Sequence, residues 1–169
     1  MNMFIQHKNK FILVAFCIII TACGATEKNP LKSTSQIAVD YRDALNDNNI
    51  NALIQLSALP VTFINQEWES APDGYGWMPG KKSTSKFDTQ TGLNKFLEIF
   101  SPGINIEGTK ATLIPRTEYD RFKTEFSGSE ALWNNLKAYI FTRGEYDVEH
   151  ITVIGVNPET HKVKALYAN

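Results

Sequence analysis

The stretch Asp40-Tyr41-Arg42-Asp43-Ala44-Leu45-Asn46-Asp47-Asn48-Asn49-Ile50-Asn51-Ala52-Leu53 carries the pattern from which the fold is predicted. Apolar side chains begin one turn upstream and recur at i, i+4, i+7 and i+8, in Ile37, Tyr41, Ala44 and Leu45. Ser33 and Gln36 stand before them at capping-box spacing. The Asn- and Asp-rich run at 46–49 favours a turn, because such side chains compete for backbone hydrogen bonds. We therefore predict an amphipathic helix, a turn and a second short helix that ends before Pro60.

Three segments that follow this helix pair have the composition of strands. Residues 61–65 are β-branched and aromatic, which is typical of a strand. Residues 104–107 and 110–114 flank Gly108-Thr109 and predict two strands joined by a tight turn. The C-terminal part alternates apolar and polar residues from position 141 onward, and residues 162–167 alternate again as a last strand. An antiparallel strand pair is therefore expected to close the chain.

Two further helices are predicted between these strands. Residues 89–100 place Leu93, Phe96, Leu97 and Phe100 on one face. The sequence Ser101-Pro102-Gly103 then stops the helix. Residues 129–140 show apolar residues at helical spacing after a Ser129 cap and predict a fourth helix. Residues 115–126 show no pattern that decides their structure.

Residues 69–86 differ in character, because Pro and Gly are interleaved with Tyr75, Trp77 and Met78. We predict a long loop that carries aromatic side chains. Loops longer than about 12–15 residues are uncommon in compact domains and are often lids or binding loops. Two interpretations stay open: a binding loop, or a compact loop whose Trp77 fills a gap in the core.

The order of two helices, a strand, a third helix and a C-terminal antiparallel pair resembles the nuclear transport factor 2-like superfamily. The resemblance rests on the opening stretch, which runs on to Pro60-Val61-Thr62-Phe63, and on Glu149-His150-Ile151-Thr152-Val153-Ile154-Gly155-Val156 with Lys162-Val163-Lys164-Ala165-Leu166. It implies an α+β fold in which a curved antiparallel sheet wraps round three or four helices and leaves a cone-shaped pocket. Residues 69–86 and 129–140 have no obvious place in the simplest member of the superfamily. This scaffold hosts isomerases, dehydratases, ligand binders and adaptors, so function must be argued from the site.

The N-terminus resembles a bacterial lipoprotein precursor. An apolar run at residues 11–20 follows Lys8 and Lys10 and closes on the lipobox Ile20-Thr21-Ala22-Cys23. A membrane-spanning helix needs about 20 apolar residues, whereas the core of a signal peptide needs about 7–15. The resemblance implies cleavage before Cys23 and a thioether bond from its thiol to diacylglycerol, so that Cys23 carries three palmitate-type acyl chains, and two or more such chains anchor a protein stably. An uncleaved anchor and an ordinary secretory signal are the alternatives.

This N-terminus sets the expected domain organisation and location. Residues 1–22 are predicted to be the signal peptide, residues 23–32 the lipidated cysteine with its tether, and residues 33–169 a single α+β domain. The expected location is the cell envelope. Gly24, rather than Asp, implies the periplasmic face of the outer membrane in a Gram-negative host.

Composition narrows the function classes. The chain has a formal net charge of −1 without a basic patch, so nucleic-acid binding is not expected. Cys17 leaves with the signal peptide and Cys23 is consumed by lipid, so the mature domain is expected to have neither a disulfide nor a cysteine nucleophile. Motifs for a serine nucleophile, a phosphate loop or a zinc site do not occur, and no metal or cofactor is predicted.

His150 is the candidate for acid–base chemistry, because histidine titrates near neutral pH. Strand alternation places it on the same face as Thr152. With Tyr41 or Tyr146 as a partner, a pocket-facing His150 would suit an isomerase or dehydratase. The alternative is a core or edge histidine that makes one hydrogen bond.

The acidic residues are interpreted as solvated faces. Three alternate ones, Glu145, Asp147 and Glu149, are about 6.5–7 Å apart along a strand, which is too far for all three to bind one ion. Three more on the first predicted helix avoid its apolar face: Asp40, Asp43 and Asp47.

Aromatic residues are the remaining signal. They gather around the predicted loop as Trp68, Tyr75, Trp77 and Phe87. Such side chains line ligand pockets and also dominate protein interfaces. The sequence thus predicts a membrane-anchored module that binds a small apolar ligand or an envelope protein, with an isomerase or dehydratase that uses His150 as the alternative. Whether the domain is a monomer or a homodimer stays open.

Overall fold

The computed structural model describes residues 32–106, 108, 110–122, 126, 128–142 and 151–169. The predicted signal peptide, Cys23 and the tether up to residue 31 lie outside these residues, as do Tyr146 and His150. In the described part of the chain, no helix is long and apolar enough to cross a membrane.

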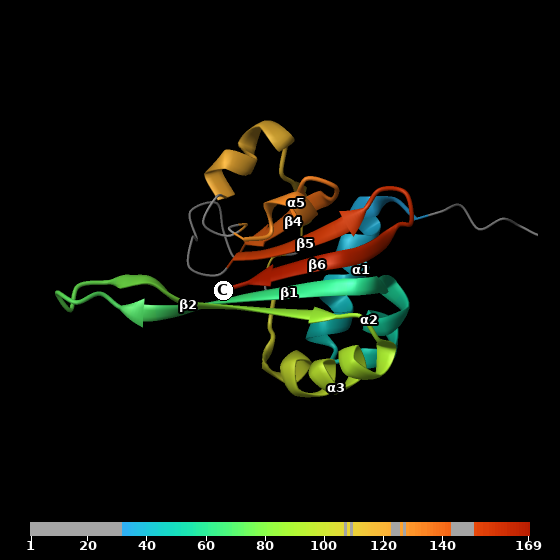
Figure 1. The fold of residues 1–169 in the computed structure, drawn as a ribbon, viewed down its shortest axis with the longest axis horizontal. Helices are drawn as coiled ribbons and strands as arrows, with labels where there is room; N and C mark the ends of the chain where they lie inside the picture. The colour runs from blue at the N-terminus through green and yellow to red at the C-terminus, as the bar shows by residue number, and fades with distance from the viewer. Residues whose placement is uncertain (1–31, 107, 109, 123–125, 127, 143–150) are drawn as a thin grey trace, which may run out of the picture. The chain divides into compact units, whose positions relative to one another are not determined.

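The described residues form a curved sheet with helices packed against it. The helical elements are α1 (Thr34–Asn46), α2 (Ile50–Leu56), α3 (Gln90–Phe100), η1 (Ser101–Gly103), η2 (Arg116–Phe122) and α5 (Glu130–Trp133). The strands are β1 (Ser57–Ser70), β2 (Trp77–Phe87), β3 (Thr112–Leu113), β4 (Lys137–Thr142), β5 (Ile151–Asn157) and β6 (Lys162–Ala168). They pair in the order β2-β1-β6-β5-β4-β3, antiparallel except for β1 with β6. Helices α1, α2 and α3 lie on one side of this sheet (Figure 1), which confirms the predicted α+β class.

Local capping signals explain why the first three helices begin where the sequence predicts. The Ser33 Oγ accepts a hydrogen bond from the Gln36 N–H at 3.2 Å and starts α1. Asn49 and Thr89 cap α2 and α3 in the same way. Each cap satisfies a backbone donor that would otherwise lack a partner in the first helical turn.

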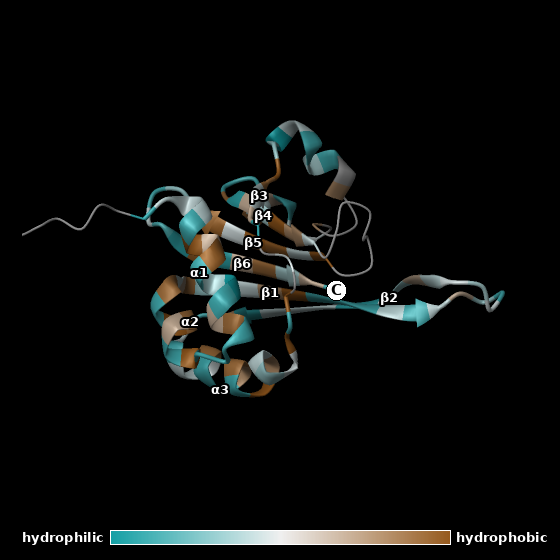
Figure 2. Cartoon of the chain, turned by 180° about the vertical axis from the view of Figure 1, so that it is seen from behind, coloured by the Kyte–Doolittle hydropathy of each residue, from teal (hydrophilic) through white to brown (hydrophobic). Residues whose placement is uncertain are grey.

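The central strands are buried on both faces of the sheet. On the inner face, Phe63 and Ile154 pack against α1, α2 and α3 in one apolar core. On the outer face, Trp133 is fully buried and stacks on Phe126 at a centroid distance of 4.4 Å. This second core also contains Ile64, Ile114, Leu136, Val153, Ala165 and Tyr167. Figure 2 shows how apolar residues follow the helices and the central strands and become sparse toward the far end of β1 and β2.

The prediction of a long loop over residues 69–86 is wrong. The chain instead continues β1 as far as Ser70, turns, and returns as β2 from Trp77. Gly74 and Gly76 in the turn have positive φ angles of 76° and 92°, a backbone region that glycine adopts without strain. Pro79 is tolerated because β2 is an edge strand of the sheet. The Gly and Pro residues thus mark one turn and one sheet edge.

The predicted helix over residues 129–140 is also wrong. Only Glu130–Trp133 is helical, and β4 begins at Lys137. Residues of β4 pair with β5 along the whole strand, from Lys137 opposite Val156 to Thr142 opposite Ile151. The helical spacing arose because Trp133 and Leu136 are buried in the outer core before β4 begins and Ile140 packs against the same core from within the strand.

Of the hairpin predicted over residues 104–114, the described residues contain one strand of two residues, β3. Thr112 and Leu113 pair with β4, while residues 104–106 are not in a strand. The backbone of Ile106 bonds to the side chain of Asn46 in α1 instead of to a neighbouring strand. This long-range contact replaces the ladder expected from the local pattern.

Candidate functional site

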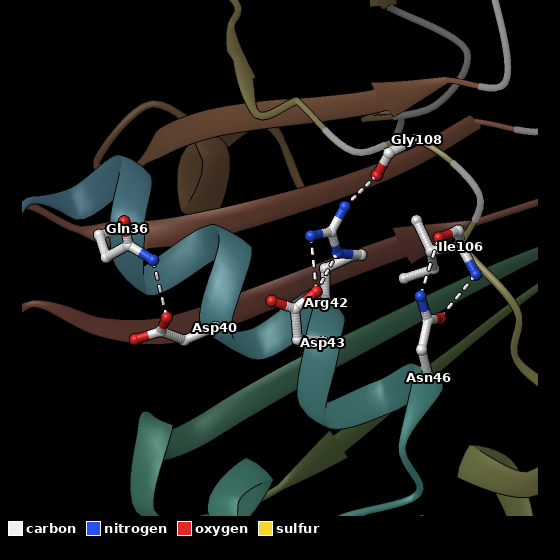
Figure 3. A network of polar contacts seen from close by, with 7 residues as sticks. All are labelled: Gln36, Asp40, Arg42, Asp43, Asn46, Ile106 and Gly108. Carbon is white, nitrogen blue, oxygen red and sulfur yellow. Dashed lines mark hydrogen bonds and ion pairs between the residues drawn. The ribbon is translucent and has the colours of Figure 1, made fainter.

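A short segment, residues 103–106 with Gly108, lines two hollows of the described chain; we call it the strap. Asn46 fixes it with two hydrogen bonds. Its Nδ2 donates to the Ile106 carbonyl at 2.9 Å, and its Oδ1 accepts from the Ile106 N–H at 2.8 Å. Ile106 itself is buried in the inner core. Figure 3 shows both bonds, which hold the strap against the end of α1.

Arg42 is the second anchor of the strap. Its guanidinium donates to the Gly108 carbonyl and forms an ion pair with Asp43, with Nε to Oδ1 at 2.6 Å. Its Cζ atom lies 5.5 Å from the centroid of the Phe141 ring. Arg42 is only 8% exposed, and a buried charge requires such partners. The Arg42 guanidinium therefore holds the strap at Gly108 (Figure 3).

One hollow, the sheet-end pocket, lies between the strap and the ends of three strands. It has a volume of about 300 Å³. Its polar groups come from Asn105, Thr142, Thr152 and Asn169. A Cβ atom added to Gly108 would lie 2.7 Å from the Thr142 carbonyl oxygen, so only glycine lets the strap approach β4 this closely. The pocket thus offers hydroxyl and amide groups around the Phe141 ring.

A second hollow, the aromatic groove, lies on the other side of Gly103 and Ile104. It has a volume of about 430 Å³ between β1, β2 and α3. Phe96 stands at the centre of its aromatic wall, 4.6 Å from Phe87, 4.8 Å from Phe63 and 4.9 Å from Phe100 in centroid distance. Its polar groups are Asn65, Ser83 and Ser85. The groove is therefore mainly apolar with a few hydrogen-bonding groups along one side.

Tyr41 is the predicted site residue that lies between sheet and helices, and Thr152 is the described residue that was predicted to share a strand face with His150. Tyr41 is fully buried in the inner core, where its hydroxyl accepts a hydrogen bond from Ser57 Oγ at 3.4 Å. Burial raises the pKa of this hydroxyl far above its usual value. Thr152 lines the sheet-end pocket. The candidate base His150 and its second predicted partner Tyr146 lie outside the described residues.

The predicted aromatic cluster lies elsewhere, on the far half of the β1–β2 hairpin. We call residues 67–80 the arm. Figure 1 shows it projecting beyond the rest of the described chain. Tyr75 is 88% exposed and Trp77 is 61% exposed, while Trp68 is partly buried. None of these three residues lines the two hollows described above.

The acidic residues of α1 are partly or fully exposed. Burial disfavours ionisation of Asp40, but hydrogen bonds from Lys32 and Gln36 and the charge of Lys32 outweigh it and lower its pKa. Asp43 is paired with Arg42, and Asp47 is exposed. Among the described residues, no group of three His, Cys, Asp or Glu side chains is placed to hold a metal ion.

The strap and its anchors were missed by sequence reasoning. Asn46 was interpreted as a turn residue, and no local signal shows that its partner Ile106 stands 60 positions later. Arg42 carried one weak signal, because it is the only charged residue among the buried residues of α1. The groove residues Phe96 and Phe100 were predicted to share a helix face, which α3 confirms.

Comparison with known proteins adds little to this geometry. No protein-family model matches the chain, and no curated protein matches it. Among solved structures, the chain is similar to a crystal structure from Kribbella flavida DSM 17836, provisionally described as a ketosteroid isomerase. The identity is 15% and the TM-score 0.32, over 80% of this chain and 75% of that one. At this distance the likeness carries no argument, so the function is argued from the chain's own residues.

Proposed function

We propose that the protein is an envelope lipoprotein, anchored through acylated Cys23, whose domain binds a small and mainly apolar ligand at the strap. The observation that carries the proposal is the pair of hollows on either side of the strap, with volumes of about 300 and 430 Å³. Binding sites for small molecules have volumes of about 300–1,000 Å³ and are mostly apolar with a few polar groups. Both hollows fall within this range of volumes, and the aromatic groove is in addition mainly apolar.

The aromatic groove favours a ligand with a flat apolar part. A ring placed against Phe96 and Phe100 would extend the existing aromatic stack, and such contacts stabilise by about 0.5–1.5 kcal/mol each beyond burial. Ser83, Ser85 and Asn65 would hydrogen-bond a hydroxyl or carbonyl group of the same ligand. The ligand class is therefore an uncharged molecule that is apolar at one end and carries one or two polar groups.

A fluorescence titration tests this binding. N-phenyl-1-naphthylamine, an uncharged aromatic probe, is expected to bind the wild-type protein and become brighter. Phe96→Ala should weaken the binding about tenfold, because it removes the central ring of the groove. Leu113→Ala is the matched control, since Leu113 is an apolar residue that is 48% exposed and lies outside both hollows. Equal affinity in the wild type and Phe96→Ala would contradict the proposal.

Lipid anchoring is tested separately. The apolar run at residues 11–20 and the lipobox ending in Cys23 support it. Cys23→Ser is expected to move the protein from the membrane fraction to the soluble fraction after cell lysis. A variant that stays in the membrane fraction would remove the anchor from the proposal without touching the binding site.

A second candidate function is catalysis by His150. It is favoured by the chain position, because Thr152, two residues further along the chain, lines the sheet-end pocket. In this alternative His150 accepts a proton from a bound substrate, as in an isomerase or dehydratase. His150→Ala would then abolish turnover but leave binding of the aromatic probe unchanged. If His150→Ala loses neither turnover nor probe binding, ligand binding remains the proposed function.

A further inference from the structure

The arm is the part of the β1–β2 hairpin that extends beyond the other described strands. Pairing between β1 and β6 ends at Asn65 opposite Ala168, and beyond this point β1 pairs only with β2. Strand β2 is the first in the sheet order, so among the described strands it has no neighbour on its other side. An isolated two-stranded hairpin is at best marginally stable. Among the described residues, the arm is therefore a projecting ribbon in which β1 and β2 pair only with each other (Figure 1).

The arm exposes apolar side chains to water. Trp68 stands opposite Pro79 and Ser70 opposite Trp77, so the two tryptophans are diagonal neighbours on one face. Met78 stands opposite Glu69 on the other face and is 40% exposed. The indole nitrogen of Trp68 is buried and has no hydrogen-bond partner among the described residues, so the exposed apolar side chains of the arm are Tyr75, Trp77 and Met78. Exposed apolar groups gathered in this way mark interaction surfaces.

Charge decides what kind of partner fits. Residues 67–80 contain Glu67, Glu69 and Asp73 and no Lys or Arg, and all three carboxylates are exposed. An anionic lipid surface would be repelled by them. A second copy of the chain would bring the same three charges against them. A cationic side chain would instead be attracted to the carboxylates and would be stabilised further over the face of the exposed Trp77 ring.

We propose that the arm docks an extended protein segment bearing Arg or Lys. Such a segment, laid along the free edge of β2, would send alternate side chains to the two faces of the ribbon. One face presents Trp68 and Trp77, and the other presents Glu69. Lys81 follows the arm at its base, so the negative region ends where the hairpin enters the body of the domain.

The position of the arm agrees with a protein partner. The described chain begins at Lys32, whose carbonyl is bonded to His161 in the turn before β6, and β6 starts beside Ser57 at the beginning of β1. The arm lies at the other end of β1, about 40 Å away at roughly 3.3 Å per residue. If the proposed lipid anchor precedes Lys32, the arm points away from that end of the domain.

The test uses the full-length protein and a labelled peptide of alternating Thr and Arg, compared with peptides of alternating Thr and Gln and of Thr and Glu. The Arg peptide is expected to bind in a salt-sensitive manner and to shift the emission of Trp77. Trp77→Ala should weaken this binding about tenfold, as should the double variant Glu67→Lys with Glu69→Lys. Binding of the naphthylamine probe to the groove should stay unchanged in both variants.

Two control variants separate docking from general charge attraction. Glu159→Lys changes an exposed acid in the turn before β6, and Leu113→Ala removes an exposed apolar side chain. Both should bind the Arg peptide as the wild type does. Equal binding of Arg and Gln peptides, or unchanged binding in the arm variants, would overturn the proposal. So would self-association or binding to anionic vesicles that depends on Trp77, because each assigns the arm to another occupant.

Discussion

The two halves of the β1–β2 hairpin belong to one strand pair, with a register shift between Gln66 and Trp68, and differ in what covers them. In the body half, Phe63 packs into the inner core and its neighbour Ile64 into the outer core. In the arm, Glu67 and Ser70 are exposed and Trp77 faces solvent. The difference is the third strand, β6, and the helices, which accompany β1 only as far as Asn65. Strand pairing alone therefore does not bury a residue, and the body half supplies stability while the arm stays available for binding.

The largest effect is expected in the body half. Phe63→Ala should lower the free energy of unfolding by about 3–5 kcal/mol, because it empties a site that is 3% exposed and touches three other rings. Chemical denaturation monitored by circular dichroism measures this loss. A change below 1 kcal/mol would show that neighbouring side chains fill the space left by the ring or that the ring is not packed as described.

The strap provides the next effect. Asn46→Ala should cost about 1–3 kcal/mol, because the N–H and the carbonyl of Ile106 both lose their partner. Asn46→Asp is the matched variant, since it keeps an acceptor for the N–H but offers no donor to the carbonyl. It should lie between the wild type and Asn46→Ala in denaturation. Identical stabilities for all three proteins would mean that the strap is not held by Asn46.

A pH titration distinguishes the buried core from the exposed arm. Because the folded-state pKa of Tyr41 is raised above its ordinary value of 10.0, the unfolded chain loses the proton first as the pH rises. The contribution of Tyr41 to the free energy of unfolding is therefore fully present below pH 10. It is lost progressively above pH 10, by about 1 kcal/mol near pH 11. Tyr41→Phe should make the decline shallower, although Tyr119, whose pKa burial also raises, keeps part of it. Trp77→Phe, a change in the arm, should leave the decline as it is.

The first three helices could be predicted from sequence because their signals are local. Ser33, Asn49 and Thr89 each cap a helix by accepting a hydrogen bond from the N–H group three residues further along the chain. The turn at 46–49 separates α1 from α2. The strand β4 could not be predicted, because Trp133 and Leu136 before it and Ile140 within it have helical spacing, and the local sequence does not reveal that they reach one core from different elements. The strap was missed for the same reason, since Asn46 and Ile106 meet only in the folded chain.

The aromatic residues of the predicted loop show the limit most clearly. The sequence left open whether Trp77 lies in a binding loop or fills the core, because Gly and Pro residues predict a break in structure without indicating how the chain pairs on either side. The same composition serves a turn at 71–76 and an edge strand at Pro79. Pairing across that turn is what brings Trp68 and Trp77 to one face, and with it the surface proposed for docking.

The smallest effect on stability is expected at Trp77, and a second tryptophan provides the comparison. Trp133 is fully buried, stacks on Phe126 and donates from its indole nitrogen to Ser129 Oγ at 3.1 Å. Trp133→Ala should therefore destabilise about as much as Phe63→Ala, by roughly 3–5 kcal/mol. Trp77→Ala removes the same side chain from a position that is 61% exposed and should change the free energy of unfolding by less than about 0.5 kcal/mol.

Denaturation of the two variants under the same conditions measures the contrast directly. Trp77→Ala should unfold like the wild type and yet lose the Arg peptide, because its ring contributes to an external surface and not to either core. If Trp77→Ala instead destabilised the protein as strongly as Trp133→Ala, the arm would have to be packed against the body in solution. The difference between the two halves of the hairpin would then disappear, and with it the reason for assigning the arm to a partner.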